Sequence, residues 1–475
     1  MDVALDLLRE AGQAAIRLFS LPYLYIAILL VWWQAAQSVT LQRKLFHVRL
    51  YSAAYLTLTR VAFGLAAGFV LSIVGVGIGA GAGLTTETLA CLWIVMAVLA
   101  LLQLRYVCLA YAAGALGLLQ AVLGWIGADF SGSAAAEAVR AVNAVDVPAL
   151  LVIAGLLHVA EGVLVRVQNA KLSIPLFLQG KRGKPMGAYS LTGVWPIPLL
   201  WLVPATGDNG LSLPWAPLFG GDTAAWAMLA FPVLIGFSDR TTTRWPEEKA
   251  RSSGNALIVY GLVIAGLAAG AVYWSPLTAV AAIAAFVLHE GLLLWSRVQE
   301  AGRAPRFSQD GTGVLVLAVL PNTPAAELGF QAGETIRKAN GVVVRNKEEL
   351  HAALQRQSAF CKLEVLNRDG NLKFLQRARY EGEHYQLGLI LAPDEDVEFV
   401  AAPRSASIWR SLRAAGARRL ESSPTMQARR EVKRAEAELA AARQAEIEAA
   451  EAAARLPDEN GGLPPRSVHS ANRKH

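Results

Sequence analysis

The chain has 475 residues, of which 54% are hydrophobic and only 17% charged, whereas a soluble globular chain carries about 25% charged residues. The mean hydropathy is +0.38, and the apolar residues are concentrated before about position 297. The formal net charge of +7 is modest for this length, and the basic residues lie mostly in short loops between apolar stretches and in the tail. This distribution is typical of a membrane protein and argues against a nucleic-acid-binding role.

The first 20 residues are expected to form an amphipathic helix on the membrane surface. They lack the basic n-region of a cleavable signal peptide. Their apolar residues recur at helical spacing. These residues are Leu5, Leu8, Ile16 and Phe19.

The region 21–297 is predicted to be an α-helical polytopic membrane bundle of about seven to nine spans. The candidate spans lie near 21–39, 59–80, 88–104, 106–127, 148–167, 193–205, 223–238, 254–274 and 277–296. The stretch 193–205 is short and contains Pro196, Pro198 and Pro204, so a re-entrant or broken helix is an alternative there.

Loop charge predicts the orientation of these spans. The basic loops contain Arg43, Lys44 and Arg49; Lys171, Lys181, Arg182 and Lys184; and Arg240, Arg244, Lys249 and Arg251. The intervening loops 81–87, 128–147 and 206–222 are poor in positive charge. By the positive-inside rule the basic loops are cytoplasmic. Since basic residues also follow the last span, the C-terminal part is expected in the cytoplasm of a multi-pass plasma-membrane protein. The side on which the N-terminus lies stays open.

Two predicted spans contain ionisable residues, His158 with Glu161 and His289 with Glu290. A membrane-embedded zinc protease would require the pattern HExxH, but position 293 is leucine. We therefore expect no catalytic centre, no metal and no cofactor. Pairing of these groups in the bundle interior is the favoured interpretation, and a proton or ion pathway is the alternative.

Cysteines and glycines give weaker signals. Cys91, Cys108 and Cys361 show no CxxC spacing and are expected to be buried free thiols. The Gly-rich segment 75–83 and the pair Gly114/Gly117 indicate either close helix contacts or self-association into a homo-oligomer.

Residues 307–393 resemble a PDZ domain, which implies a small α+β fold. The likeness rests on several elements that occur in the right order. They are Pro321-x-x-Pro324-Ala325, Gly329-Phe330, Gly333-Glu334, Ile336, Asn340-Gly341 and an amphipathic helix with Leu350 and Leu354.

PDZ domains bind the C-terminus of a partner by strand addition, with backbone N–H groups holding the terminal carboxylate. In the circularly permuted bacterial arrangement the loop that does this comes last. The predicted peptide-binding residues are Tyr385, Gln386, Leu387, Gly388 and Leu389 in this loop, with Leu350 and Leu354 on the helix. Glycine at 388 would allow close approach of a ligand. The alternative is that 387–391 is only the closing strand.

The remaining sequence is predicted to be a basic, Ala/Glu-rich helical segment at 403–456 followed by disorder at 457–475. A stable coiled coil is not expected, because the apolar residues do not keep a heptad seam.

Several features resemble the MinJ-like proteins of Gram-positive bacteria. They are Leu21-Pro22-Tyr23 to Gln42-Arg43-Lys44, Phe237-Ser238-Asp239-Arg240, His289-Glu290-Gly291 and the PDZ-like module that follows the last span. The tail departs from this likeness, being longer and richer in Ala and Arg.

This resemblance implies a membrane-anchored PDZ adaptor of division-site selection, which links a DivIVA-type polar scaffold to the septum-inhibiting ATPase MinD. Its partners would be proteins bound through the groove and the cytoplasmic loops, together with the lipid bilayer. Two other classes stay open: a transporter or channel with a regulatory PDZ domain, and a degenerate relative of the site-2-type intramembrane proteases.

Overall fold

The computed structural model describes residues 2–127, 134–180, 183–205, 210–220, 223, 225–357, 360–378 and 387–394. The predicted tail segments 403–456 and 457–475 lie outside these residues, as do Tyr385 and Gln386 of the predicted groove.

Helices make up most of the region before residue 302. They are α1 (Asp2–Ser20), α2 (Pro22–Phe46), α3 (Ala53–Ile78), α4 (Thr86–Leu102), a 3-10 turn (Leu104–Tyr106), α5 (Leu109–Ile126), α6 (Ala134–Asn143), α7 (Val147–Leu164) with a π-helical extension (Val165–Asn169), α8 (Pro246–Ala271) and α9 (Leu277–Ala301). Within the described residues, six helices are long and apolar enough to cross a membrane, and α4 is a shorter apolar helix. The chain is therefore an α-helical polytopic membrane protein, as predicted.

Two of the predicted spans are strands and not helices. The stretch 193–205 lies in β2 (Pro185–Pro204) and 223–238 lies mostly in β3 (Trp226–Thr241), and these strands pair antiparallel along their length, with Trp195 opposite Ile235. Proline removes a helical hydrogen bond and clashes with the preceding turn, which disfavours a helix at both places. A strand rises about 3.3 Å per residue, so about ten residues cover the hydrocarbon core of ~30 Å.

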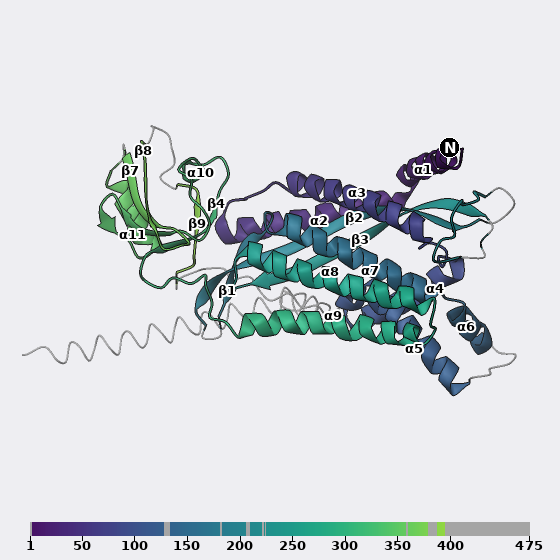
Figure 1. The fold of residues 1–475 in the computed structure, drawn as a ribbon. Helices are drawn as coiled ribbons and strands as arrows, with labels where there is room; N and C mark the ends of the chain where they lie inside the picture. Colours follow the sequence, from purple (N-terminus) through teal and green to yellow (C-terminus); the bar gives the residue numbers. More distant parts are fainter. Residues whose placement is uncertain are drawn as a thin grey trace, which may run out of the picture. The chain divides into compact units, whose positions relative to one another are not determined.

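The hairpin packs against helices, chiefly α3 and α2 with smaller contacts from α7 and α8 (Figure 1). Glycines on α3 let its backbone approach β2 closely. A Cβ added at Gly64 would lie 2.2 Å from the carbonyl oxygen of Pro196, and one at Gly68 would lie 2.4 Å from that of Pro198. The central strand β2 is thereby covered by protein, as strand backbone requires at membrane depth.

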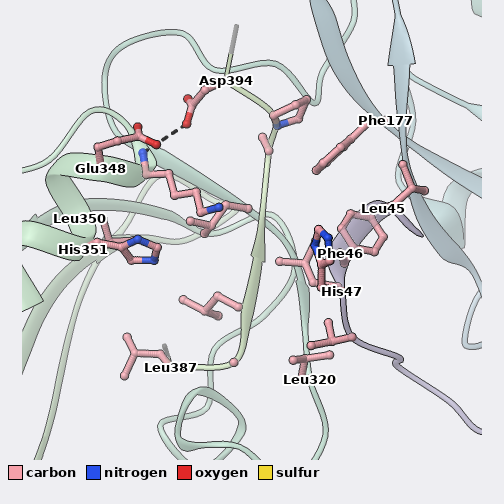
Figure 2. Close-up of a pocket in the computed structure, with 18 of the residues that line it drawn as sticks. Leu45, Phe46, His47, Phe177, Leu320, Glu348, Leu350, His351, Leu387 and Asp394 are labelled. Atoms are coloured by element: carbon pink, nitrogen blue, oxygen red, sulfur yellow. Dashed lines mark hydrogen bonds between the residues drawn. The ribbon is translucent and has the colours of Figure 1, made fainter. Parts of the chain in front are cut away.

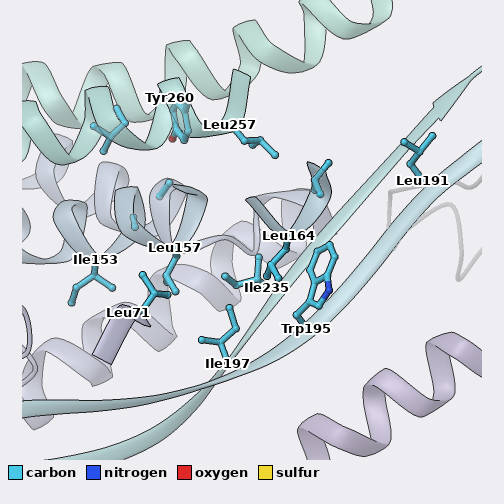
Figure 3. Packing of buried hydrophobic residues seen from close by; sticks show 14 of the residues in the cluster. Leu71, Ile153, Leu157, Leu164, Leu191, Trp195, Ile197, Ile235, Leu257 and Tyr260 are labelled. Carbon is cyan, nitrogen blue, oxygen red and sulfur yellow. The ribbon is translucent and has the colours of Figure 1, made fainter. Parts of the chain in front are cut away.

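A continuous apolar core joins the helices to the hairpin. Figure 3 shows Leu157 and Leu164 of α7, Tyr260 of α8, and Trp195 and Ile197 of β2 in this core. All five side chains are buried. The hairpin therefore belongs to the same folding unit as the membrane helices.

Close helix contacts at glycines are confirmed for α5. A Cβ at Gly114 would lie 3.1 Å from the carbonyl oxygen of Ala282 on α9, and one at Gly117 would lie 2.9 Å from the side chain of Val147. Self-association stays a prediction.

Helix α1 is present as expected and packs by one face only. Ala14 and Leu18 are buried with Leu24 and Ala230. The four apolar residues on which the prediction rested are between 61% and 70% exposed, namely Leu5, Leu8, Ile16 and Phe19. An exposed apolar face suits a helix at a membrane surface, and that location stays a prediction.

The C-terminal module is a six-stranded sheet with two helices. Its elements are β4 (Val314–Val319), α10 (Pro324–Glu327), β5 (Thr335–Ala339), β6 (Val342–Val343), α11 (Lys347–Gln355), β7 (Phe360–Leu366), β8 (Leu372–Ala378) and β9 (Leu389–Leu391). The strand order is β8-β7-β5-β4-β9, with β6 paired to β5. Strand β1 (Ile174–Gln179) instead joins the β2–β3 sheet.

This module packs directly on the membrane region. Leu317 and Ile390 belong to the core of the membrane region and not to that of the module. The hydroxyl of Tyr189 donates to the carbonyl oxygen of Leu317 at 2.5 Å. The amide of Gly187 donates to the carbonyl oxygen of Phe307 at 2.7 Å. The two regions are thus connected by packing and hydrogen bonds as well as by the chain.

Candidate functional site

A cavity of about 660 Å³ lies along β9 and α11, where the sequence predicts the peptide groove (Figure 2). Its lining includes the predicted residues Leu350, Leu354, Leu387, Gly388 and Leu389. The structure therefore brings together the described members of the predicted site, which are nearly 40 residues apart in the sequence.

The loop before β9 is held in place by backbone hydrogen bonds. The amide of Ala325 donates to the carbonyl oxygen of Leu387, and the amide of Leu320 donates to that of Gly388, both at 2.9 Å. Strand β9 then pairs with β4, with Leu389 opposite Val319. The carbonyl oxygens of Leu387 and Gly388 therefore point toward the segment 320–325 of the module.

Gly388 has a structural reason to be glycine. Its φ is +85°, a conformation that costs other residues energy. A Cβ added there would lie 2.4 Å from Cβ of Thr323. The requirement for glycine follows from this internal contact, in addition to the predicted approach of a ligand.

Helix α11 forms the opposite wall of the cavity. The side chain of Asn346 caps it by accepting a hydrogen bond from the amide of Glu349 at 2.8 Å. Leu350 and Leu354 line the cavity but also belong to the buried core of the module, at 2% and 3% exposure. Both leucines therefore stabilise the fold as well as shaping the groove.

The sequence reasoning missed the polar lining residues of α11, which are Lys347, Glu348 and His351. Partial burial, together with the nearby Lys347 ammonium, lowers the pKa of His351 below its usual range. The available signal was helical spacing, since Lys347 and His351 are four residues apart and share one face of the helix.

The sequence reasoning also missed a third wall, which comes from the end of α2 and from β1. Phe46 packs edge to face on Phe177, with ring centroids 5.1 Å apart, and both line the cavity with His47. Phe46 and His47 lie about 260 positions before residue 307, and Phe177 lies 130 positions before it, so no local pattern could have connected them to the module.

Positive charge lies beside the loop that is predicted to bind a carboxylate, in a cavity that Glu348 and Asp394 also line. Lys44 lines the cavity, and Arg43 and Arg49 line an adjoining hollow with Pro321 and Thr323. Cations beside such a loop would favour a terminal carboxylate. Among the described residues, the cavity thus combines apolar walls, the edge strand β9 and positive charge.

The predicted intramembrane residues fall into two neighbouring groups. In the first, His158 Nε2 lies 3.9 Å from Glu161 Oε2 and 3.6 Å from the Sγ atom of Cys108. In the second, the hydroxyl of Tyr111 donates to Glu290 at 2.8 Å, and Glu290 pairs with Arg105 at 3.2 Å.

His289 connects the two groups. Its Nδ1 lies 2.8 Å from the hydroxyl of Tyr111, and its ring centroid lies 5.4 Å from that of His158. The structure therefore brings together three of the four predicted residues and adds Cys108, while Glu290 turns toward Arg105. Glu161 lies beside His158, whereas Glu290 pairs with Arg105, a partner that the sequence did not identify. Whether these groups serve packing or a proton pathway stays a prediction.

Comparison with known proteins agrees with this architecture. The PDZ domain family model matches residues 315–368. A helical membrane region that carries such a domain defines the chain as a multi-pass membrane PDZ protein.

The relatives define the class further. The chain is 31% identical to the cell division topological determinant MinJ of Bacillus subtilis (strain 168), over 82% of this chain and 96% of that protein. It is 28% identical to a probable cell division topological determinant MinJ of Lacticaseibacillus paracasei, over 52% of this chain and 66% of that protein. The chain therefore belongs to the MinJ family of cell division topological determinants. These names describe determinants of division topology and not enzymes.

Proposed function

We propose that this chain is a membrane-anchored adaptor of division-site selection, and that its PDZ groove binds the C-terminal peptide of a protein partner. The cavity between β9 and α11 is the observation that carries this proposal. It combines a strand edge, apolar walls from Leu387 and Phe46, and the cationic Lys44 beside the loop. Strand addition with carboxylate capture uses these three features.

The charge of the loops supports a cytoplasmic groove. The basic residues at the end of α2 line the cavity itself or its neighbour. Of the loops at the other ends of the helices, 81–87 has no Lys or Arg and 128–147 has only Arg140. By the positive-inside rule, the groove and the C-terminus would face the cytoplasm.

Partners of the MinD and DivIVA types fit this role, as the family resemblance implies. An adaptor fixed at the membrane raises the effective concentration of whatever it binds, so a modest affinity for a short peptide is sufficient. A transporter role loses one of its grounds, because the proline-rich stretch 193–205 is a strand and not a broken helix.

The test uses the full chain in cells, because the module packs on the membrane region. A photo-crosslinking amino acid replaces His351 in the groove, and a matched one replaces Phe374, which is 61% exposed on β8 and does not line the cavity. We expect specific cross-linked proteins from position 351 and not from 374. Their identification by mass spectrometry then names the partner.

Localisation gives a second readout. A fluorescent fusion should form foci at septum and pole, and these should be lost on Lys347→Glu/His351→Trp in the groove while protein levels stay normal. A uniform membrane signal from the unaltered chain would count against a division adaptor. Identical cross-linking at the two positions would count against the groove.

A further inference from the structure

Three membrane helices bring metal-ligating side chains to one point. Cys108 precedes α5, His158 lies in α7 and His289 lies in α9, and one ligand atom from each lies within 4.8 Å of the other two. His158 is 4% exposed and the other two are partly buried. These residues are far apart in sequence, and no part of the adaptor role uses them.

The hydrogen bonds fix both histidines in the tautomer that a metal requires. Nδ1 of His158 lies 2.7 Å from the carbonyl oxygen of Ala154. A carbonyl only accepts, so this Nδ1 carries the proton and the Nε2 lone pair points toward Cys108, 3.6 Å from its sulfur.

The same reasoning holds for His289. The hydroxyl of Tyr111 donates its proton to Glu290, which also forms an ion pair with Arg105. The hydroxyl oxygen must then accept from Nδ1–H of His289, which leaves Nε2 unprotonated. A chain of histidine, hydroxyl and carboxylate is the kind of outer shell that orients metal-binding imidazoles.

A carboxylate oxygen lies near these three residues and could be the fourth ligand. Glu161 is 8% exposed, and its Oε2 lies 3.9 Å from Nε2 of His158. One thiolate and one carboxylate would neutralise a divalent cation, so the complete site would bring no net charge into the membrane interior. An isolated charge there is costly.

The dimensions fit zinc. With Zn–N near 2.0–2.1 Å and Zn–S near 2.3 Å, the ligand atoms of a tetrahedral site lie roughly 3.3–3.6 Å apart. The sulfur of Cys108 already lies at 3.6 Å from His158. The ligand atoms all lie within 4.8 Å of one another, so side-chain rotations that shorten the largest separation by about 1 Å would give a tetrahedral site. Sulfur, imidazole and carboxylate ligands together suit Zn²⁺.

We infer that Cys108, His158 and His289, with Glu161 as the fourth ligand, form a structural zinc site that joins α5, α7 and α9. The HExxH pattern is not needed for such a site, because the second histidine comes from another helix. The ion would cross-link three spans. His158 and His289 are each oriented by a hydrogen bond from Nδ1, and Cys108 and Glu161 lie beside His158.

The test measures metal in the full chain, purified in detergent with an affinity tag that contains no histidine. We expect about one zinc per chain by mass spectrometry. Cobalt added after removal of zinc should give a thiolate-to-metal charge-transfer band. Cys108→Ser and His289→Gln should each lower the zinc content at least about tenfold, while the matched Cys91→Ser on α4 should not.

A second pair of measurements keeps the result decisive if these variants fold poorly. Chelation should lower the thermal midpoint of the unaltered chain, and added zinc should restore it. Tyr111→Phe keeps all four ligands but removes the outer hydrogen bond, so it should weaken zinc affinity about 10- to 100-fold. The inference is overturned if the folded, unaltered chain takes up neither zinc nor cobalt, or if Cys91→Ser removes the metal as well.

Discussion

The guanidinium of Arg368 lies over the indole ring of Trp245, with Cζ 4.0 Å from the ring centroid. Arg368 belongs to the hairpin between β7 and β8, and Trp245 precedes the first residue of the membrane helix α8. The same guanidinium lies 3.8 Å from Glu247, and a Cβ added at Gly333 would lie 2.2 Å from the indole. This contact attaches the PDZ domain to a membrane helix.

Arg368→Ala should loosen this attachment. A cation–π contact contributes about 0.5–2 kcal/mol, which corresponds to a roughly 2- to 30-fold increase in local opening. Hydrogen exchange of the full chain should report this increase at the amides of Gly187 and Arg306, which donate across the junction to Phe307 and Thr242. Arg337→Ala removes an exposed arginine of β5 and serves as the control. Equal exchange in both variants would show that Arg368 does not stabilise the junction.

Replacing a buried lysine in the first turn of α8 should destabilise the chain. Lys249 is 3% exposed, and its Nζ lies 3.1 Å from Asp239 of β3 and 3.4 Å from Glu300 of α9. Lys249→Met leaves two carboxylates without their cation, and such a loss typically costs about 3–5 kcal/mol. Denaturant unfolding in detergent measures it.

The matched control for this experiment is Arg251→Met, at an exposed position of the same helix. The double variant Lys249→Met/Asp239→Asn should lose less stability than the sum of the two single variants, because removing both partners leaves fewer unpaired charges. Additive losses would mean that Lys249 and Asp239 do not interact.

Hydropathy predicted the membrane region because a span needs a long apolar run, and this property is local. It did not distinguish the hairpin from helices, because a buried strand and a buried helix are both continuously apolar. The prolines at 196 and 198 argue against a regular helix but do not by themselves predict a central strand. The close approach of β2 to Gly64 and Gly68 of α3 is a tertiary contact that the sequence does not reveal.

For the two sites as well, local sequence patterns predicted some residues and missed those that only tertiary packing brings together. The order of turns and helices in the module predicted the PDZ fold and the lining residues Leu387 and Leu350. The wall formed by Phe46 and the place of Cys108 beside His158 depend on contacts between distant helices. Such contacts arise from tertiary packing, and a single sequence contains no local trace of them.

Gly388→Ala should destabilise the loop of the groove by internal strain. A φ of +85° costs an L-residue about 1–3 kcal/mol, and the new Cβ would also clash with Thr323. Exchange of the Leu320 and Ala325 amides, which donate to Gly388 and Leu387, should rise accordingly.

Gly341→Ala is the control that separates strain from clash, since Gly341 has a φ of +83° and nothing within 4 Å of an added Cβ. It should cost less than Gly388→Ala. Thr323→Gly should restore part of the stability lost in Gly388→Ala, because it removes the clash and leaves the strain. If Gly341→Ala is as costly as Gly388→Ala, the contact with Thr323 does not contribute.

His351 should make the stability of the PDZ domain depend on pH. Burial and the nearby Lys347 lower its pKa in the folded chain, whereas in the unfolded chain it lies near ~6.5. As pH falls through that value, the unfolded state therefore binds more protons, and stability decreases. Asp310 acts in a different pH range. Burial alone would raise its pKa, but hydrogen bonds from Thr312 lower it, so the stability that Asp310 contributes is lost only at more acid pH. Thermal unfolding between pH ~7.5 and ~5.5 should thus show a decline that His351→Gln reduces, and an unchanged decline in that variant would assign the effect to other groups.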